Sequence, residues 1–458
     1  MAKPPLFPWA PGEPAQTGDI GLLEALGPLA AMHAALDAVG AGIPCGIMAR
    51  LEGRNVAEVE DALHRAALRF PLLRQRLVWR HGKPRSVCDA TAPLGPHHDP
   101  AFSLAFRVGP QGRPWSYDLK QAGRDVWLRA VFAHAIADGY SMLHFLGTVV
   151  AEVEATDYHP PKLDPRPATS PRSFRSWLPG FLALQGRSFA SIATHDSEPG
   201  VVWTTVPLAE VMPLLSRVQS ELGGFGSLLA ASASLAVARA ARAPFAHPVL
   251  LNLQVMRSRL AAFNGFGFGA GSVMLPVHVG AGDEPTSTAR SIATRARRLV
   301  DEDWDGNLNK MIGQSPVRHR LMARLKSRQS CDPTLTVSWK PRPVSFGREG
   351  SVQDVACFAS SSGTHVSAHL DQNGLSLSLT NWQAETARVA MFDDLLRGLG
   401  VRSTTRYLHC ADPVAAGETA AARGRPAWTR REPAAGAHGG IGPSHGPAIP
   451  DPMPSGTA

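Results

Sequence analysis

The clearest chemical pattern in the chain surrounds His134, which stands four residues before an aspartate and a glycine in the order H-x-x-x-D-G. A neutral imidazole accepts a proton near neutral pH, so a histidine fixed at a strand end is suited to act as a general base. Asp138, in the tight turn that follows, would brace the loop. Two plainer roles stay open: His134 as a core histidine bonded to the backbone, and Asp138 as a residue that shapes a turn or begins a helix.

The residues around this motif predict the elements that hold it. From Asp125 to His134, apolar residues recur at every second position, which is typical of a half-buried strand. Ser141 follows the motif and is expected to cap a helix whose apolar residues run from 142 to 150. The motif is therefore expected at a strand-to-helix junction.

Composition places the chain among globular proteins. It has 458 residues, of which 44% are hydrophobic and 18% charged. No apolar run approaches the roughly 20 residues that span a bilayer, and the first residues lack the apolar core of a signal peptide. The five cysteines are widely spaced without a C-x-x-C pair, which indicates neither a zinc knuckle nor a disulfide framework. We expect a cytoplasmic protein.

The formal net charge of +8 suits anionic partners, such as a nucleotide-bearing thioester or the acidic face of a carrier protein. The basic residues are not interleaved with aromatic ones, so nucleic acid is not an expected partner. An arginine-rich stretch from Arg290 to Arg328 fits the same anionic partners, or is simply the solvated face of two helices.

The distribution of proline and of apolar residues predicts four segments. Residues 1–155 form an N-terminal half that carries the motif, and residues 156–200 form a proline-rich linker. Residues 201–412 alternate strands with helices, and residues 413–458 have too few large apolar residues to fold. The predicted fold class is α/β (α+β).

Apolar periodicity predicts the individual elements. Helices are expected within Asn55–Arg76, Ser227–Arg242, Thr286–Trp304, Leu308–Arg328 and Glu385–Leu399, and strands within Pro248–Val255, Ser272–Val279, Thr334–Ser338 and Val366–Leu379. Four alternating glycines from Gly265 to Gly271 lie between two of these strands with no helix directly after them, which argues against a dinucleotide-binding loop. The chain has no G-x-S-x-G and no H-E-x-x-H motif, so neither a serine hydrolase nor a zinc peptidase is indicated.

Four stretches together carry a family resemblance: Arg69–Arg74, His134–Ser141, Leu251–Val277 with its Asn252, Arg257 and Asn264, and Gly374–Leu399. In this order they resemble segments of the thioester-dependent acyltransferases that share the chloramphenicol acetyltransferase fold. That superfamily includes condensation domains of nonribosomal peptide synthetases, wax-ester-synthase-like enzymes and alcohol acetyltransferases. The chain departs from it at Ala133, where many relatives have a second histidine. It departs again at Val337–Lys340, where many have S-N-x-G, and it lacks the D-F-G-W-G loop of the plant branch.

The resemblance implies two halves that form a V with a central tunnel. His134 would take the proton of the acceptor, and Asp138 would pair with an arginine, for which Arg257 is the candidate. The backbone N–H of Gly139 would lie near the developing oxyanion. Ser338 and Asn264 would contact the substrates.

The predicted function is therefore acyl transfer from a CoA thioester, or from an acyl carrier protein, to an alcohol or amine in lipid or secondary metabolism. Donor and acceptor are small molecules, and neither a bound cofactor nor a metal is implied. Two alternatives remain. One is a catalytically inactive condensation-like domain that binds a partner or carrier protein. The other is an unrelated α/β binding protein in which the motif is accidental.

Overall fold

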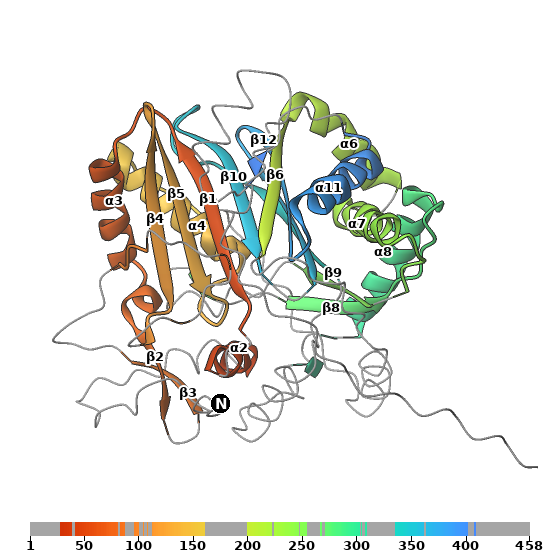
Figure 1. Ribbon diagram of the computed structural model, residues 1–458, viewed down its shortest axis with the longest axis horizontal. Helices are drawn as coiled ribbons and strands as arrows, with labels where there is room; N and C mark the ends of the chain where they lie inside the picture. The colour runs from red at the N-terminus through yellow and green to blue at the C-terminus, as the bar shows by residue number, and fades with distance from the viewer. Residues whose placement is uncertain are drawn as a thin grey trace, which may run out of the picture.

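A computed structural model describes residues 28–38, 42–80, 83–87, 96–99, 104, 108, 112–160, 199–221, 224–246, 248–253, 266–267, 271–302, 304, 307–308, 335–360, 363–401 and 407–408. These residues form two larger β-sheets that lie side by side, each with helices packed against one face (Figure 1). Each half has its own apolar core between its sheet and its helices.

The smaller of these two sheets has the strand order β10-β1-β5-β4, and its strands are all antiparallel. Its strands are β1 (Pro44–Leu51), β4 (Trp115–Ala122), β5 (Asp125–Ala133) and β10 (Val352–Ala359). The rest of this half comprises α2 (Pro28–Ala38), α3 (Val56–Leu68), a 3-10 turn (Pro71–Arg74), the hairpin β2 (Arg76–Arg80) and β3 (Lys83–Val87), and α4 (Gly139–Glu154).

Local sequence explains these elements. Asn55 caps α3 by accepting a hydrogen bond from the backbone N–H of Glu58, and the helix ends at Leu68, before Pro71 begins the 3-10 turn. On β5, the alternate residues from Val126 to Phe132 are fully buried against the helices. The predicted strand and helix on either side of the motif are confirmed as β5 and α4.

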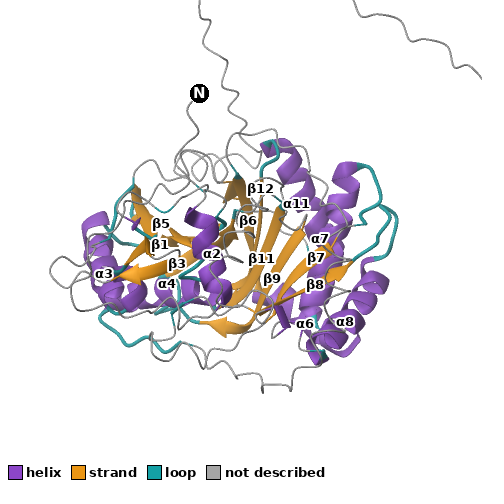
Figure 2. Cartoon of the chain, turned by 90° about the horizontal axis from the view of Figure 1, so that it is seen from below, coloured by secondary structure: helices purple, strands orange, loops and turns teal. Residues whose placement is uncertain are grey.

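The larger sheet has the order β13-β6-β12-β11-β9-β7-β8, with β9 parallel to both β7 and β11. Its strands are β6 (Gly200–Pro207), β7 (Pro248–Leu253), β8 (Gly271–Pro276), β9 (Leu335–Val344), β11 (Thr364–Asp371), β12 (Gly374–Asn381) and β13 (Tyr407–Leu408). Figure 2 shows its helices gathered beside the sheet: α6 (Leu208–Glu221), α7 (Phe225–Ala241), α8 (Pro285–Asp301) and α11 (Glu385–Leu399).

Most predicted elements of this half are present, and α11 has the predicted bounds. Strand β9 continues past the predicted end at Ser338 to Val344, and its pairing with β11 shifts register beyond Lys340. The predicted helix over 308–328 and the predicted unfolded tail over 413–458 lie almost entirely or entirely outside the described residues. Within the described part, no helix is long and apolar enough to cross a membrane.

One strand joins the two halves. β10 follows β9 in the sequence, but it pairs with β1 in the other sheet. At the bulge in this pairing, Asp354 has a left-handed backbone (φ +53°), and its carbonyl accepts a hydrogen bond from the Trp203 indole at 3.2 Å. The strand is thus bonded to both sheets.

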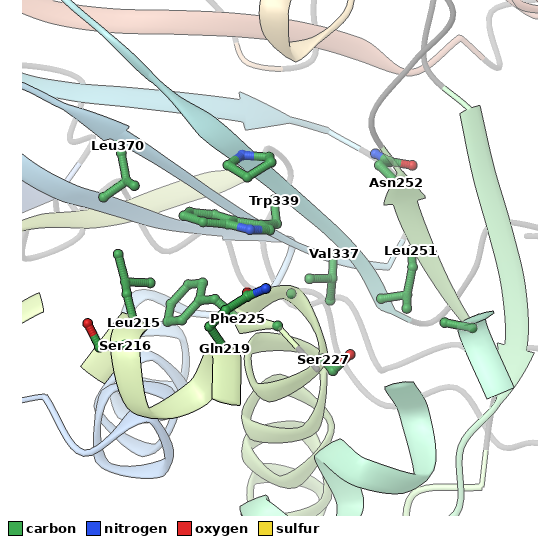
Figure 3. Close-up of a pocket in the computed structure, with 14 residues that line it drawn as sticks. Leu215, Ser216, Gln219, Phe225, Ser227, Leu251, Asn252, Val337, Trp339 and Leu370 are labelled. Carbon is green, nitrogen blue, oxygen red and sulfur yellow. The ribbon is translucent and has the colours of Figure 1, made fainter. Parts of the chain in front are cut away.

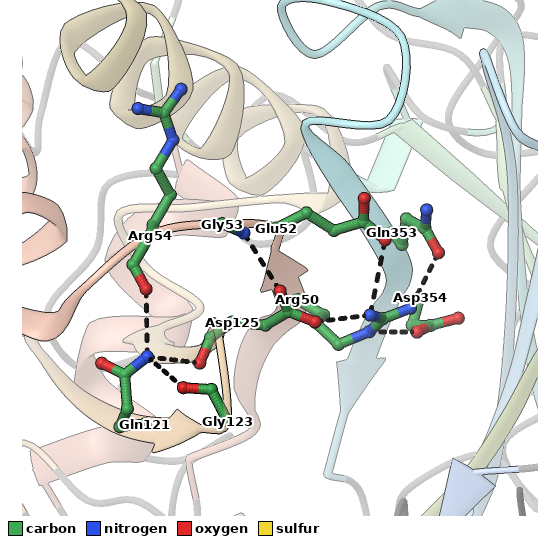
Figure 4. A network of polar contacts seen from close by, with 9 residues as sticks. All are labelled: Arg50, Glu52, Gly53, Arg54, Gln121, Gly123, Asp125, Gln353 and Asp354. Carbon is green, nitrogen blue, oxygen red and sulfur yellow. Dashed lines mark hydrogen bonds and ion pairs between the residues drawn. The ribbon is translucent and has the colours of Figure 1, made fainter.

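A polar network around Arg50 fixes β10 in place (Figure 4). The Arg50 guanidinium donates to Asp354 on β10 at 2.8 Å, to Asp125 on β5 at 2.7 Å and to Gln353 at 2.7 Å. The Arg50 side chain is 23% exposed and bonds carboxylates of two other strands. Arg50 therefore connects β1, β5 and β10.

We predict that Arg50→Met lowers the free energy of unfolding by about 2–3 kcal/mol, because two partly buried carboxylates lose their cation. Urea unfolding measures this. Arg298→Met, which removes a pair with Glu302 in which the arginine side chain is 80% exposed, is the control and should change it by about 0.5 kcal/mol or less. Equal effects of the two variants would contradict the role given to Arg50.

Candidate active site

The His134 ring is oriented by the loop that carries it. Strand β5 ends at Ala133, and His134 follows in a turn with its side chain half-buried. Its Nδ1 lies 2.8 Å from the carbonyl oxygen of Ala137. A carbonyl oxygen can only accept, so Nδ1 must carry the hydrogen, and in the neutral ring Nε2 then has the lone pair. This is the tautomer that a general base acting through Nε2 requires.

Asp138 begins α4. Its Oδ1 accepts hydrogen bonds from the Ser141 backbone N–H at 2.8 Å and from the Ser141 hydroxyl at 2.9 Å. The prediction that Ser141 caps the helix is therefore wrong: Asp138 is the N-cap, because its extended backbone turns its carboxylate toward the first N–H groups of the helix. The carboxylate is buried at this position, which fits a structural brace.

Ser141 instead connects the motif to the glycine-rich stretch of the second half. Its Oγ lies 2.9 Å from the backbone N–H of Gly267 and 2.7 Å from the carbonyl oxygen of the same residue. The neighbouring Phe266 is fully buried in the core of the N-terminal half, with its ring centroid 4.9 Å from that of Phe70. Two residues of the second half are thus built into the surroundings of the motif.

A residue of the larger sheet approaches the motif closely at Gly139. A Cβ atom at Gly139 would lie 2.1 Å from Cε of Lys340, so any other residue at this position would displace the end of the lysine side chain. Lys340 lies on β9, is almost fully buried, and donates hydrogen bonds to Ser367 Oγ at 2.7 Å and to Ser338 Oγ at 3.3 Å. Gly139 and Ser338, both predicted from the sequence, therefore meet through Lys340.

Burial lowers the pKa of Lys340, and this shift is opposed by Cys357 and Asp138 nearby. Asp138 thus lies within electrostatic reach of a cation from the other half. The predicted partner of Asp138, Arg257, and the predicted substrate contact, Asn264, lie outside the described residues.

The face of the larger sheet that carries Lys340 is polar across several strands. Asn252, Ser338, Ser367 and Ser378 stand in register on β7, β9, β11 and β12. The described neighbours of these residues, such as Val337, Val366 and Leu377, are apolar and belong to the core of this half. Strand alternation therefore gives the sheet one apolar face and one face of hydroxyl, amide and amine groups.

Two further histidines lie near His134. The ring of His33, from α2, is 4.8 Å from that of His134 at an angle of 61°. His365, on β11, is buried, and burial together with Lys340 and His134 lowers its pKa to about 3. His365 is therefore neutral at physiological pH and adds no charge beside His134.

Cys357, His369 and Asp371 form a second buried group of ionisable residues, with Cys357 also in electrostatic contact with Lys340. Burial alone would lower the pKa of His369, but Cys357 and Asp371 raise it to about 9. Burial alone would raise the pKa of Cys357, but His369 and Lys340 lower it. Each group therefore shifts the pKa of the other toward its charged form, against the effect of burial. Among the described side chains, no group of three His, Cys, Asp or Glu residues is arranged to hold a metal ion.

Sequence reasoning did not identify Lys340, His33 or His365 as site residues. A signal for two of them was present, because polar residues alternate with apolar ones from Thr336 to Lys340 and from His365 to Asp371. Such alternation shows that one strand face is polar. It does not show that this face lies beside His134.

The fold is similar to that of several solved proteins. The first condensation domain of the calcium-dependent antibiotic synthetase matches with a TM-score of 0.56 and 14% identity over 84% of this chain and 96% of that domain. Polyketide synthase associated protein 5 from Mycobacterium tuberculosis matches with a TM-score of 0.52 and 16% identity over 78% and 93%. SgcC5 from Streptomyces globisporus matches with a TM-score of 0.51 and 15% identity over 82% and 97%.

Neither a protein-family model nor a curated protein matches the sequence. At these low identities, the structural similarity defines the fold. The described chain has the mixed α/β fold of a whole condensation domain, built from two halves like chloramphenicol acetyltransferase. The predicted resemblance to this superfamily is confirmed at the level of the fold.

The depressed pKa of His365 predicts a pH effect. The folded chain binds this proton only near pH 3, whereas the unfolded chain binds it near the ordinary value of 6.5, so stability falls as pH drops below 6.5. His365→Gln should therefore lose about 2 kcal/mol less stability than the wild type between pH 7 and pH 5. Urea unfolding at both pH values tests this, with the exposed His159→Gln as control. Parallel losses in the wild type and His365→Gln would contradict the assignment.

Proposed function

We propose that the chain is an acyltransferase that moves an acyl group from a CoA or carrier-protein thioester to an alcohol or amine, with His134 as the general base. The observation that carries this proposal is the contact between His134 Nδ1 and the Ala137 carbonyl, because it fixes the tautomer in which Nε2 carries the lone pair. The similarity of the fold to condensation domains supports the reaction class.

In the proposed reaction, His134 Nε2 removes the proton from the acceptor hydroxyl or amine while the acceptor oxygen or nitrogen attacks the thioester carbonyl. The tetrahedral intermediate then collapses as the carbon–sulfur bond breaks. The imidazolium returns the proton to the departing thiolate sulfur. No covalent acyl-enzyme is needed, because the thioester is already activated.

The developing oxyanion needs donors near the motif. Gly139 is the first residue of α4, so its N–H belongs to the unsatisfied, partially positive end of the helix. We assign this N–H as the donor that stabilises the oxyanion. We assign Ser338, on β9, as a residue that contacts the tetrahedral intermediate. Lys340 positions both, since it packs on Gly139 and bonds to Ser338.

The remaining predicted parts complete the proposal. Asp138 acts as a brace and does not relay the proton, with Arg257 as its proposed ion-pair partner and Asn264 as a proposed substrate contact. The two halves, 1–155 and 201–412, would form a V around a tunnel that donor and acceptor enter from opposite faces.

We predict that His134→Ala lowers acyl transfer by about 10²–10⁴-fold, the usual contribution of a general base. The assay supplies acyl-CoA thioesters with mixed alcohols and amines, and mass spectrometry detects the acylated products. His159→Ala, which removes an exposed histidine, is the matched control and should keep full activity.

Equal product formation by His134→Ala and the wild type would contradict the proposal. If no CoA donor gives product, acyl-loaded carrier proteins replace them in the same assay. Absence of product with both donor classes would overturn the acyltransferase proposal and favour the inactive binding module.

A further inference from the structure

A pocket of about 590 Å³ lies on the side of the larger sheet that faces the helices, away from the polar face (Figure 3). Strand β9 contributes residues to both faces of the sheet. Its residues Val337 and Trp339 line the pocket, whereas Ser338 and Lys340 lie on the face that meets the motif. Asn252, in register with Ser338, also lines the pocket at its β7 edge, but the part formed by β9, α6 and α7 lies on the face opposite the candidate active site.

The walls of the pocket are largely apolar. Figure 3 shows Trp339 lying over Phe225, with Leu215 and Leu370 toward one side and Leu251 toward the other. None of the described residues that line the pocket carries a charge, and the polar lining groups are hydroxyls, amides and backbone. The volume falls within the range of small-molecule sites, and the lining chemistry selects an uncharged apolar ligand.

Glycines keep the pocket open where α7 begins. Gly224 has a positive φ of 130° and no atom within 4 Å of a Cβ built upon it, and Gly226 would place a Cβ 3.3 Å from Trp339 Cδ1. A side chain at Gly226 would press on the indole, and a side chain at Gly224 would be strained by the backbone conformation. The sequence thus leaves this space empty where most residues would fill it.

The aromatic residues already pack on each other. The ring centroids of Phe225 and Trp339 are 4.7 Å apart and tilted by 59°. The other large apolar side chains of the lining are branched aliphatic residues, with Pro341 beside Trp339. This surface suits a flexible aliphatic chain better than a third stacked ring.

The geometry points to a second ligand site at this pocket, for an uncharged molecule with an aliphatic chain, such as a long-chain alcohol or the tail of a neutral lipid. The inference does not depend on acyl transfer, because it rests on the opposite face of β9. A chain that catalyses nothing would still bind here.

Photolabelling with a decanol that carries a diazirine group tests this inference. We expect saturable labelling of peptides from α6, the start of α7 and β9, and competition by 1-decanol. Decanoate and decyltrimethylammonium should compete at least about tenfold less well, because none of the described lining residues carries a charge. Labelling confined to other peptides, or equal competition by the charged chains, would overturn the inference.

A substitution on α8 tests whether the ligand binds in this pocket. Ala296 lines the pocket, so Ala296→Phe should fill it and reduce labelling by about tenfold or more. Ala293→Phe is the matched control, because Ala293 is also half-buried on α8 but does not line the pocket. Ala296→Leu serves as a milder block if the phenylalanine variant fails to fold. Labelling that both Ala296 variants leave unchanged would contradict the site.

Discussion

The candidate site depends on the close approach of Lys340 to Gly139. A lysine on a strand of the larger sheet extends across the first residue of α4 in the other half, at a distance that no Cβ atom would allow. A buried ammonium is costly unless it is bonded, and two serine hydroxyls and a nearby carboxylate stabilise this one. The contact therefore requires the glycine of the motif, the serines of the sheet and the relative position of the two halves together.

Other contacts hold the halves in the arrangement that this approach needs. β10 leaves the second half of the sequence to pair with β1, and Arg50 bonds it to the first sheet. Two further residues of the second half contact the first half: Phe266 packs against Phe70 in its core, and Gly267 is hydrogen-bonded to Ser141. Because segments of the second half complete the first, neither half alone holds the whole candidate site.

The local parts of this arrangement were predictable from the sequence, and the long-range parts were not. The alternation of β5, the motif at its end and the bounds of α11 follow from periodicity over a few residues. The cap on α4 was assigned to Ser141 instead of Asp138, because both residue types cap helices and only the backbone angles distinguish them. The pairing of β10 with β1 joins residues about 300 positions apart, which no local pattern specifies. The alternation from Thr336 to Lys340 indicates a polar strand face, but the contact of Lys340 with Gly139 follows only from the fold.

A double-mutant cycle on Gly139→Ala and Lys340→Ala tests the central claim most directly, by urea unfolding of the wild type and three variants. Gly139→Ala alone should cost about 1–3 kcal/mol because its Cβ meets the lysine, whereas Gly282→Ala, with no atom near its added Cβ, should cost far less. With the lysine truncated, the alanine at 139 should cost at least about 1 kcal/mol less than it does in the wild-type background. Additive effects of the two substitutions would show that Lys340 does not pack on Gly139, and would contradict the joining of the two halves at this point.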